Sequence, residues 1–321
     1  MRIGVVELEV GHPETNLRAA RRALEACAAE GCRLVLFPAY LGNVLSEEGM
    51  EVFLRFRRGE LTRAAFPDWE ELFSRWARET GVYLVGGSVL VPAGSEASPG
   101  YANLCPAFSP SGEVLLRQLQ THADAEERER GLVTGDELGR FSAEGFVVGP
   151  VVSTDVRVPE VSRVHCLLGA TLLVVPSAVP GYSPWAQLAG LWQEVQQNQV
   201  FGAEACLVGE LGGLSFRGRT AVFGPCEMTP GKSGFLAGFS SFYRDLTLRY
   251  MGDETPPELQ EPWDVAPGRG TALTGEGYRI LVVDLDPAEL RATWQEYDIF
   301  GELNLNLYRR HLPEVYGGGE R

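Results

Sequence analysis

The sequence lacks any apolar run long enough to cross a bilayer. A membrane-spanning helix needs roughly 20 consecutive apolar residues, and no stretch of the 321-residue chain approaches that length. The first residues, Met1 to Val6, lead directly into a strand-like stretch, without the basic, apolar and small-residue succession of a secretory signal peptide. We therefore expect a soluble protein located in the cytoplasm.

The sequence also has few positively charged residues. The chain has 28 lysine and arginine residues against 43 aspartate and glutamate residues, so its formal net charge is −15. An acidic surface of this size repels phosphate backbones and anionic lipid headgroups. Nucleic acid and membrane-surface partners are therefore not expected.

Paired cysteines are absent as well. Six cysteines are scattered singly, with no Cys-x-x-Cys pair and no clustering with the four histidines. Because zinc sites need such clusters, we expect no metal, and nothing in the sequence indicates another cofactor. Reactive thiols need surroundings that stabilise the thiolate. Buried, inert cysteines are the expectation, with Cys27 on the apolar side of a helix as the example.

The composition is that of a globular protein. Hydrophobic residues make up 45% of the chain and charged residues 22%, which excludes disordered and fibrous classes. No linker divides the sequence, so residues 1–321 are interpreted as one large domain of two similar halves.

Strands and helices alternate along the first part of the chain. A strand at 3–8 leads into a helix that begins near Pro13 and is stopped by Gly31, and a continuous apolar run at 33–38 indicates a strand buried on both faces. A second helix carries an apolar stripe around Trp76, and a strand is predicted at 82–91. The predicted order is β-α-β-α-β.

The rest of the chain mixes a hairpin with further α/β units. The hairpin joins 101–108 to 113–120 through a Pro-Ser-Gly turn. Further strands are predicted at 146–152, 171–175, 205–209, 219–223 and 278–285, and helices at 159–168, around 188–195 and at 287–296. Residues 228–276 are predicted to be an irregular insertion, dense in proline and glycine but rich in aromatics, and the last few residues are expected to fray.

Three segments in order resemble the nitrilase or carbon-nitrogen hydrolase superfamily. The run from Leu34 to Ala39 ends where the family has Phe-Pro-Glu, and the run from Gly112 to His122 has Gln120 where the family has lysine. The run from Val151 to Glu160 has Ser153 where the family has cysteine, followed by matching Asp155, Arg157 and Glu160. Supporting matches include Tyr101-Ala102-Asn103 and Val283-Asp284-Leu285-Asp286.

The resemblance implies a fold and an oligomer. It implies an α/β protein, a four-layer α-β-β-α sandwich that usually forms a homodimer. In that family a cysteine thiolate attacks a nitrile or amide carbon, a glutamate acts as base and a lysine stabilises the tetrahedral intermediate. Here the three positions read Ala39, Gln120 and Ser153.

These three residues cannot perform the family's chemistry as it stands. Ala39 has no atom that accepts a proton, and Gln120 carries no positive charge. Losing a single oxyanion donor typically costs about 2.7 to 4 kcal/mol of transition-state stabilisation. Ser153 is a hydroxyl nucleophile that is barely ionised near neutral pH and depends on an adjacent base. No catalytic residue is therefore expected by the family mechanism.

Other residues offer alternatives. His122 could serve Ser153 as a substitute base, oriented by Asp124, Glu126 or Glu127, although the default role of His122 is structural. Glu127 approximates the family's accessory glutamate and is equally consistent with a solvated charged loop. Asp155, Arg157 and Glu160 are expected mainly to support the turn after Ser153. The binding residues expected at the pocket are Ser153, Thr154, Gln120, Glu127 and His122.

Three functions follow from these residues. The first is an inactive homologue that binds a small amide-like or carboxylate ligand, or a protein partner, with the Thr154 N–H facing the pocket. The second is an active amidase-type hydrolase, acting on C–N bonds other than peptide bonds through Ser153 and a substitute base. The third is a structural subunit of an oligomer.

Overall fold

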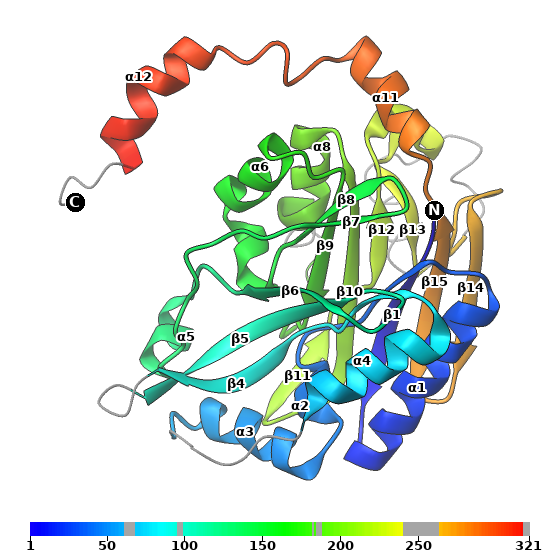
Figure 1. The fold of residues 1–321 in the computed structure, drawn as a ribbon, viewed down its shortest axis with the longest axis vertical. Helices are drawn as coiled ribbons and strands as arrows, with labels where there is room; N and C mark the ends of the chain where they lie inside the picture. Colours follow the sequence, from blue (N-terminus) through cyan, green and yellow to red (C-terminus); the bar gives the residue numbers. More distant parts are fainter. Residues whose placement is uncertain (61–67, 95–98, 182, 184–187, 240–262, 317–321) are drawn as a thin grey trace.

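The structure is a computed structural model that describes residues 1–60, 68–94, 99–181, 183, 188–239 and 263–316 (Figure 1). In this part of the chain the strands are β1 (Arg2–Val10), β2 (Leu34–Leu36), β3 (Tyr83–Val85), β4 (Val89–Gly94), β5 (Pro99–Phe108), β6 (Val114–Leu119), β7 (Phe141–Ala143), β8 (Phe146–Pro150), β9 (Leu172–Ser177), β10 (Phe201–Leu211), β11 (Leu214–Arg217), β12 (Ala221–Phe223), β13 (Phe235–Gly238), β14 (Gly270–Gly275) and β15 (Tyr278–Asp284). The α-helices are α1 (Pro13–Ala29), α2 (Leu41–Val44), α3 (Glu47–Arg57), α4 (Trp69–Thr80), α5 (Ala125–Glu129), α6 (Pro159–Leu167), α8 (Gln193–Asn198), α11 (Pro287–Glu296) and α12 (Leu305–Tyr316). Short irregular helices are η1 (Ser153–Arg157), η2 (Leu188–Trp192), η3 (Cys226–Met228) and η4 (Pro230–Lys232).

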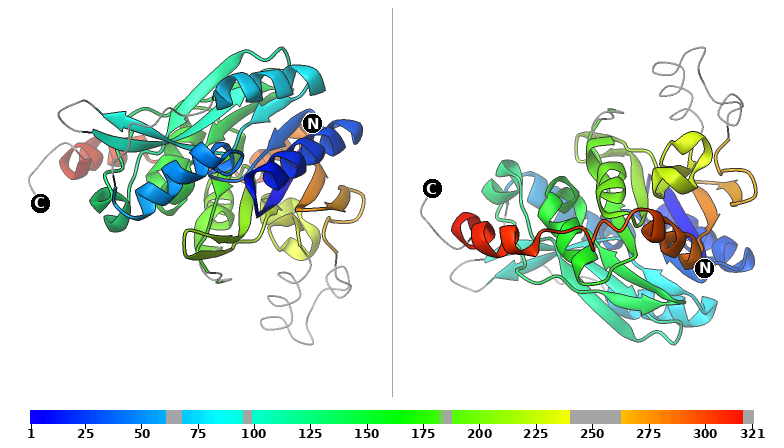
Figure 2. Two further views of the ribbon diagram at one scale, coloured as in Figure 1. Left: turned by 90° about the horizontal axis from the view of Figure 1, so that it is seen from below. Right: turned by 90° about the horizontal axis from the view of Figure 1, so that it is seen from above.

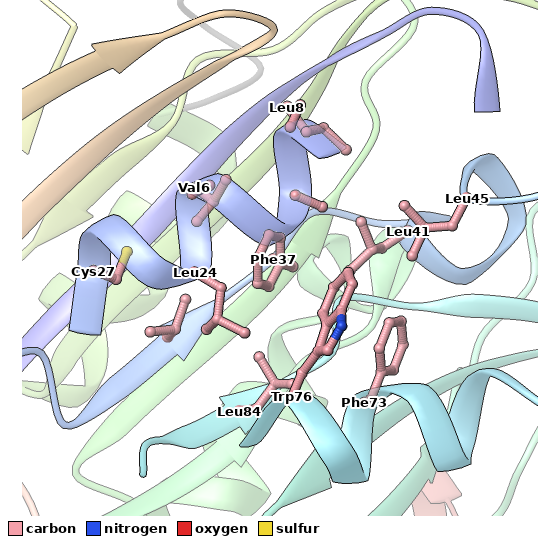
Figure 3. Close-up of a cluster of buried hydrophobic side chains, with 14 of the residues drawn as sticks. Val6, Leu8, Leu24, Cys27, Phe37, Leu41, Leu45, Phe73, Trp76 and Leu84 are labelled. Atoms are coloured by element: carbon pink, nitrogen blue, oxygen red, sulfur yellow. The ribbon is translucent and has the colours of Figure 1, made fainter. Parts of the chain in front are cut away.

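Hydrophobic side chains fill three spaces between four layers of secondary structure. Successive residues of β1 point to opposite faces, so Val6 lies in the core beneath α1 and α4 (Figure 3) while Val5 lies in the core between the sheet halves. In β9, Leu172 shares that central core and Leu173 packs beneath α6 and α8. The layers are therefore helix, sheet, sheet and helix, and the predicted α-β-β-α sandwich is confirmed.

Strand β1 joins the two halves of the sheet. It pairs in parallel with β2 over Ile3 to Val5 and in parallel with β10 over Leu8 to Val10, while β15 runs antiparallel along its other side. Parallel pairs β2–β3, β10–β9 and β9–β8 extend the sheet in the two halves. The predicted hairpin is confirmed as β5 and β6, which pair antiparallel.

Two predicted elements are interrupted where glycine permits a change of direction. The strand expected at 82–91 is two strands, because Gly87 has a φ of +67° and a Cβ there would lie 1.9 Å from the Pro38 carbonyl oxygen. The helix expected around 188–195 changes direction at Gly190, whose φ of −107° and ψ of −128° are not helical. Helix α3 was not predicted from the sequence.

The interpretation of 228–276 as irregular is wrong at both ends. Strand β13 pairs antiparallel with β12, and β14 pairs antiparallel with β15. Residues 240–262, with half of the segment's aromatics, lie outside the described residues, as do the last residues, 317–321, which were expected to fray. Helix α12 was not predicted, and it lies at the periphery in both views of Figure 2.

Neither a membrane-spanning helix nor a reactive cysteine is expected from the sequence, and the described part of the chain can be compared with both expectations. None of its helices combines the length and the apolar character that crossing a membrane requires. All six cysteines are free and five are buried, with Cys226 half-buried. Burial raises the pKa of the Cys166 thiol to about 12 and that of the Cys226 thiol to about 11, which keeps both protonated near neutral pH.

Candidate ligand site

Each of the three positions singled out in the sequence follows the end of a strand. Ala39 comes after β2, Gln120 directly after β6 and Ser153 shortly after β8. The strands thus bring residues that are far apart in the sequence to one region. Ala39 itself is fully buried, and its backbone N–H donates to the Ser177 carbonyl oxygen at 3.3 Å.

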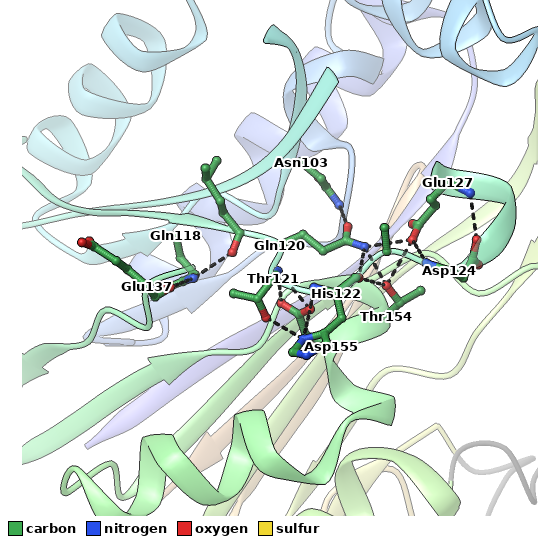
Figure 4. A network of polar contacts seen from close by, with 12 residues as sticks. Asn103, Gln118, Gln120, Thr121, His122, Asp124, Glu127, Glu137, Thr154 and Asp155 are labelled. Atoms are coloured by element: carbon green, nitrogen blue, oxygen red, sulfur yellow. Dashed lines mark hydrogen bonds and ion pairs between the residues drawn. The ribbon is translucent and has the colours of Figure 1, made fainter. Parts of the chain in front are cut away.

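Gln120 is buried and bonded on both sides of its amide group (Figure 4). Its Oε1 accepts from Asn103 Nδ2 at 2.9 Å. Its Nε2 lies 2.8 Å from the His122 carbonyl oxygen, 3.0 Å from Glu127 Oε2 and 2.6 Å from Thr154 Oγ1. Because an amide nitrogen has two hydrogens and three acceptors surround it, no donor of Gln120 is left for a ligand.

Glu127 is fixed by the start of helix α5. Asp124 accepts from the Glu127 backbone N–H at 2.8 Å, and Glu127 Oε2 accepts from the Asp124 N–H at 2.9 Å, which completes a capping box. Burial raises the pKa of the Glu127 carboxyl above its ordinary value. Of its two sequence interpretations, the solvated loop is wrong, because the side chain is buried beside Gln120.

Ser153 begins the turn η1 with a left-handed backbone. Its φ is +54°, in a region that L residues rarely adopt. No hydrogen bond of its hydroxyl is found in the part of the chain that the structure describes. The next side chain, Thr154, has its Oγ1 2.8 Å from the His122 carbonyl oxygen and 3.3 Å from Glu127 Oε2. Among the described residues, no hydrogen bond therefore links Ser153 to a base.

Asp155 supports the turn from beneath, as expected. It is 1% exposed and accepts from the Thr121 N–H at 2.9 Å and from the His122 N–H at 2.7 Å. The His122 ring lies beside Thr121 Oγ1, at 2.9 Å, and its Nδ1 is 3.5 Å from Asp155. His122 is about half exposed and is not among the described residues that line the cavity beside Ser153. The suggested Ser153–His122 pair is not formed.

A cavity of about 200 Å³ opens beside Ser153. Ser153, Thr154 and Glu127 line it, together with Tyr40, whose backbone is left-handed with a φ of +60°. Ala39, Gln120 and His122 are not part of its described wall. Ligand sites for drug-sized molecules usually measure about 300 to 1,000 Å³, so this cavity suits a ligand of only a few heavy atoms.

Four arginines of the cavity wall were not singled out as binding residues from the sequence. They come from four different segments: Arg57, Arg130, Arg157 and Arg219. Arg57 and Arg130 belong to runs of charged residues that resemble ordinary solvated helix faces, so the sequence carried no signal for them. The described residues contain no group of three or more histidine, cysteine, aspartate or glutamate side chains placed to hold a metal.

A family model described as carbon-nitrogen hydrolase matches residues 2–226. The chain belongs to the carbon-nitrogen hydrolase family. Among curated proteins, omega-amidase NIT2 of Danio rerio is 26% identical over 265 residues, covering 78% of this chain and 90% of that protein. Omega-amidase NIT2-B of Xenopus laevis is 26% identical over 250 residues, covering 74% and 85%.

Solved structures of the family share the fold. The amidase of Nesterenkonia sp. AN1 superposes with a TM-score of 0.64 at 21% identity, covering 96% of this chain and 98% of that one. A double mutant of the same amidase in complex with acrylamide gives a TM-score of 0.65 at 21% identity, covering 96% of both chains. At this identity the likeness supports the nitrilase-type fold and no more.

In this member of the carbon-nitrogen hydrolase family, no lysine is available to take the place of Gln120. The sequence contains a single lysine, Lys232, which lies on η4 and does not line the described cavity wall. Any cation that meets a ligand from this wall is therefore a guanidinium group. Arginine binds planar anions well but does not lose its proton, unlike a lysine whose pKa is lowered by burial.

Proposed function

We propose that this carbon-nitrogen hydrolase family member binds a small amide or carboxylate ligand beside Ser153 without hydrolysing it by a thiolate mechanism. The observation that carries this proposal is the position of Gln120, whose amide is bonded to Asn103, Glu127 and Thr154 and has no donor left for an oxyanion. The small cavity supports the ligand class. So do structures of the Nesterenkonia amidase with acrylamide and butyramide.

The proposal is tested by measuring binding and turnover in the same samples. Wild type and Ser153→Ala are incubated with a panel of amides, nitriles, N-carbamoyl compounds and carboxylates. We expect members of the panel to raise the melting temperature, because a ligand that binds only the folded state stabilises it. A panel that leaves the melting temperature unchanged up to millimolar concentration would contradict binding.

Ser153→Cys is expected to leave amide hydrolysis at the background rate. A thiol is a better nucleophile than a hydroxyl, but the variant still has alanine at position 39 and an engaged amide at position 120. Ammonia release measures the outcome, and alkylation by iodoacetamide confirms that the new thiol is accessible. Rapid turnover by Ser153→Cys would mean that another group supplies the base.

An active amidase is the second candidate, favoured by the names of the similar proteins, which are omega-amidases and amidases. It would need a carboxylate that reaches Ser153. The candidate is Glu127, a buried acid on the cavity wall whose Oε2 lies 3.3 Å from Oγ1 of the adjacent Thr154. The burial-raised pKa of Glu127 is consistent with a general base working near neutral pH. Turnover lost in both Ser153→Ala and Glu127→Gln would favour this candidate.

We also propose that the chain forms a homodimer. Helix α12 exposes large apolar side chains, and so does the outer face of α6: Leu305, Leu307, Tyr308, Leu312 and Tyr316 on α12, with Val164, Leu167 and Leu168 at α6. A twofold arrangement would let helix α12 of each copy cover the α6 face of the other. The chain has a mass of 35.1 kDa, and light scattering should give twice that value. The double variant Leu307→Glu with Leu312→Glu should give a monomer. A wild-type monomer at micromolar concentration contradicts this.

A further inference from the structure

Two arginines and one glutamate from separate elements meet on the cavity wall. Arg57 is the last residue of α3, Arg130 directly follows α5, and Glu126 lies on α5. Arg57 Nη1 is 3.5 Å from Glu126 Oε1, and Arg130 Nη2 contacts the same oxygen. A single carboxylate oxygen therefore serves two guanidinium groups, although each group could bind a whole carboxylate through two N–H donors.

The three side chains differ sharply in exposure. Arg57 is 19% exposed and Arg130 16%, whereas Glu126 is 58% exposed. Arg57 Nε is buried, and within the described residues it has no hydrogen-bond partner. An exposed ion pair contributes little, about 0 to 1 kcal/mol, while an unsatisfied buried donor is costly. The Arg57 guanidinium is thus short of an acceptor, and Glu126, the most exposed of the three side chains, can turn into solvent.

The other charged groups of the wall do not satisfy these two arginines. The carboxylates of Asp124 and Glu127 are committed to the capping box and to Gln120. Glu204 comes from β10, and the two further cations are Arg157 and Arg219. When Glu126 turns away, the side of the cavity formed by α3 and α5 offers the N–H donors of Arg57 and Arg130, and the described wall as a whole has four arginines against three carboxylates.

We propose that the ligand of this cavity carries a carboxylate, that Arg57 and Arg130 bind it, and that Glu126 occupies its place until the ligand displaces it. This rests on the proposed binding function and names the ligand class of that site. Carboxylate is favoured because two partly desolvated guanidinium groups match its planar oxygens. A neutral amide cannot compete with Glu126 for them. In a chain of net charge −15, a wall with one more arginine than carboxylates once Glu126 is displaced favours an anion.

The test compares two ligands that differ in one group. Butyrate and butyramide have the same carbon chain and nearly the same size. Their binding to the full-length protein is measured by calorimetry for wild type, Glu126→Gln and Arg130→Gln. The control is Glu129→Gln, which removes an exposed charge from the same helix α5 at a residue outside the described cavity wall. Ammonia is assayed in each butyramide sample.

We expect wild type to bind butyrate more tightly than butyramide. Glu126→Gln should tighten butyrate binding about fivefold, since loss of an exposed ion pair of up to about 1 kcal/mol removes the competitor. Arg130→Gln should weaken butyrate binding about tenfold or more. Neither change should alter the affinity for butyramide, and Glu129→Gln should behave as wild type.

The possible failures are distinguishable. Equal affinity for the two ligands, or unchanged butyrate affinity in Glu126→Gln, overturns the carboxylate inference and leaves the binding function standing. Release of ammonia from butyramide overturns the proposed lack of turnover and leaves the carboxylate preference to be judged from butyrate. Absence of binding by both ligands to every variant overturns both proposals.

Discussion

Asp155→Ala is expected to lower the free energy of unfolding by about 4 kcal/mol. The carboxylate is 1% exposed and accepts the backbone N–H groups of Thr121 and His122. Its removal leaves two partly buried donors unsatisfied, each costing about 1 to 3 kcal/mol, in addition to the lost charge-assisted bonds. The His122 carbonyl oxygen, which accepts from Gln120 and Thr154, would also lose its fixed position.

Urea unfolding of Asp155→Ala against Asp136→Ala checks this prediction. Asp136 is an exposed acid in the loop between α5 and β7, so its substitution should change stability by no more than about 0.5 kcal/mol. A loss below about 1 kcal/mol in Asp155→Ala would contradict the role given to this carboxylate. Ligand binding by the surviving folded fraction should weaken as well, because η1 carries Ser153 into the cavity.

Glu194→Gln is expected to stabilise the protein above pH 7 and to leave its stability unchanged below pH 4.5. Glu194 is 2% exposed, and burial raises the pKa of its carboxyl from 4.5 to about 7. The unfolded chain therefore loses this proton at a lower pH than the folded chain, and stability falls as pH rises from 4.5 to 7. A difference of about 2.5 pKa units corresponds to roughly 3 kcal/mol, which glutamine avoids because it carries no charge.

A second buried group acts in the opposite direction. Burial lowers the pKa of His165 from 6.5 to about 4, so the unfolded chain takes up a proton first as pH falls, and stability is lost between pH 6.5 and 4. In wild type the two slopes partly cancel between pH 4.5 and 6.5. The stability of Glu194→Gln should therefore fall more steeply than that of wild type as the pH drops from 6.5 to 4.5. Thermal unfolding from pH 4 to 8 measures this, and a stability difference independent of pH would contradict it.

The fold followed from the sequence because its strands are short, apolar and ordered as in the family. The runs at 33–38 and 171–175 are buried on both faces, and their positions were predicted closely. The hairpin could be predicted because the local sequence alone indicates its turn. The turn ends at Gly112, which has a φ of +84°. Helices α3 and α12 were missed because charged and apolar residues are mixed in both, and no neighbouring strand indicated a helix there.

The site was predicted in part, and the missing part depended on distant contacts. Ser153, Thr154 and Glu127 line the cavity, and their role in binding stays a prediction. The engagement of Gln120 with Asn103 could not be foreseen, because it depends on the register of β5 and β6. The ion cluster of Arg57, Glu126 and Arg130 joins residues about 70 positions apart in the chain, and no local pattern marks such a pair.

The most direct test of the central claim is ammonia release from the amide and nitrile panel by purified wild type, with Ser153→Ala as the control. We expect equal background rates from the two proteins, together with a rise in melting temperature in the presence of small carboxylates. Turnover by wild type that disappears in Ser153→Ala would contradict the account, because it would show that Ser153 is an activated nucleophile despite Ala39 and Gln120.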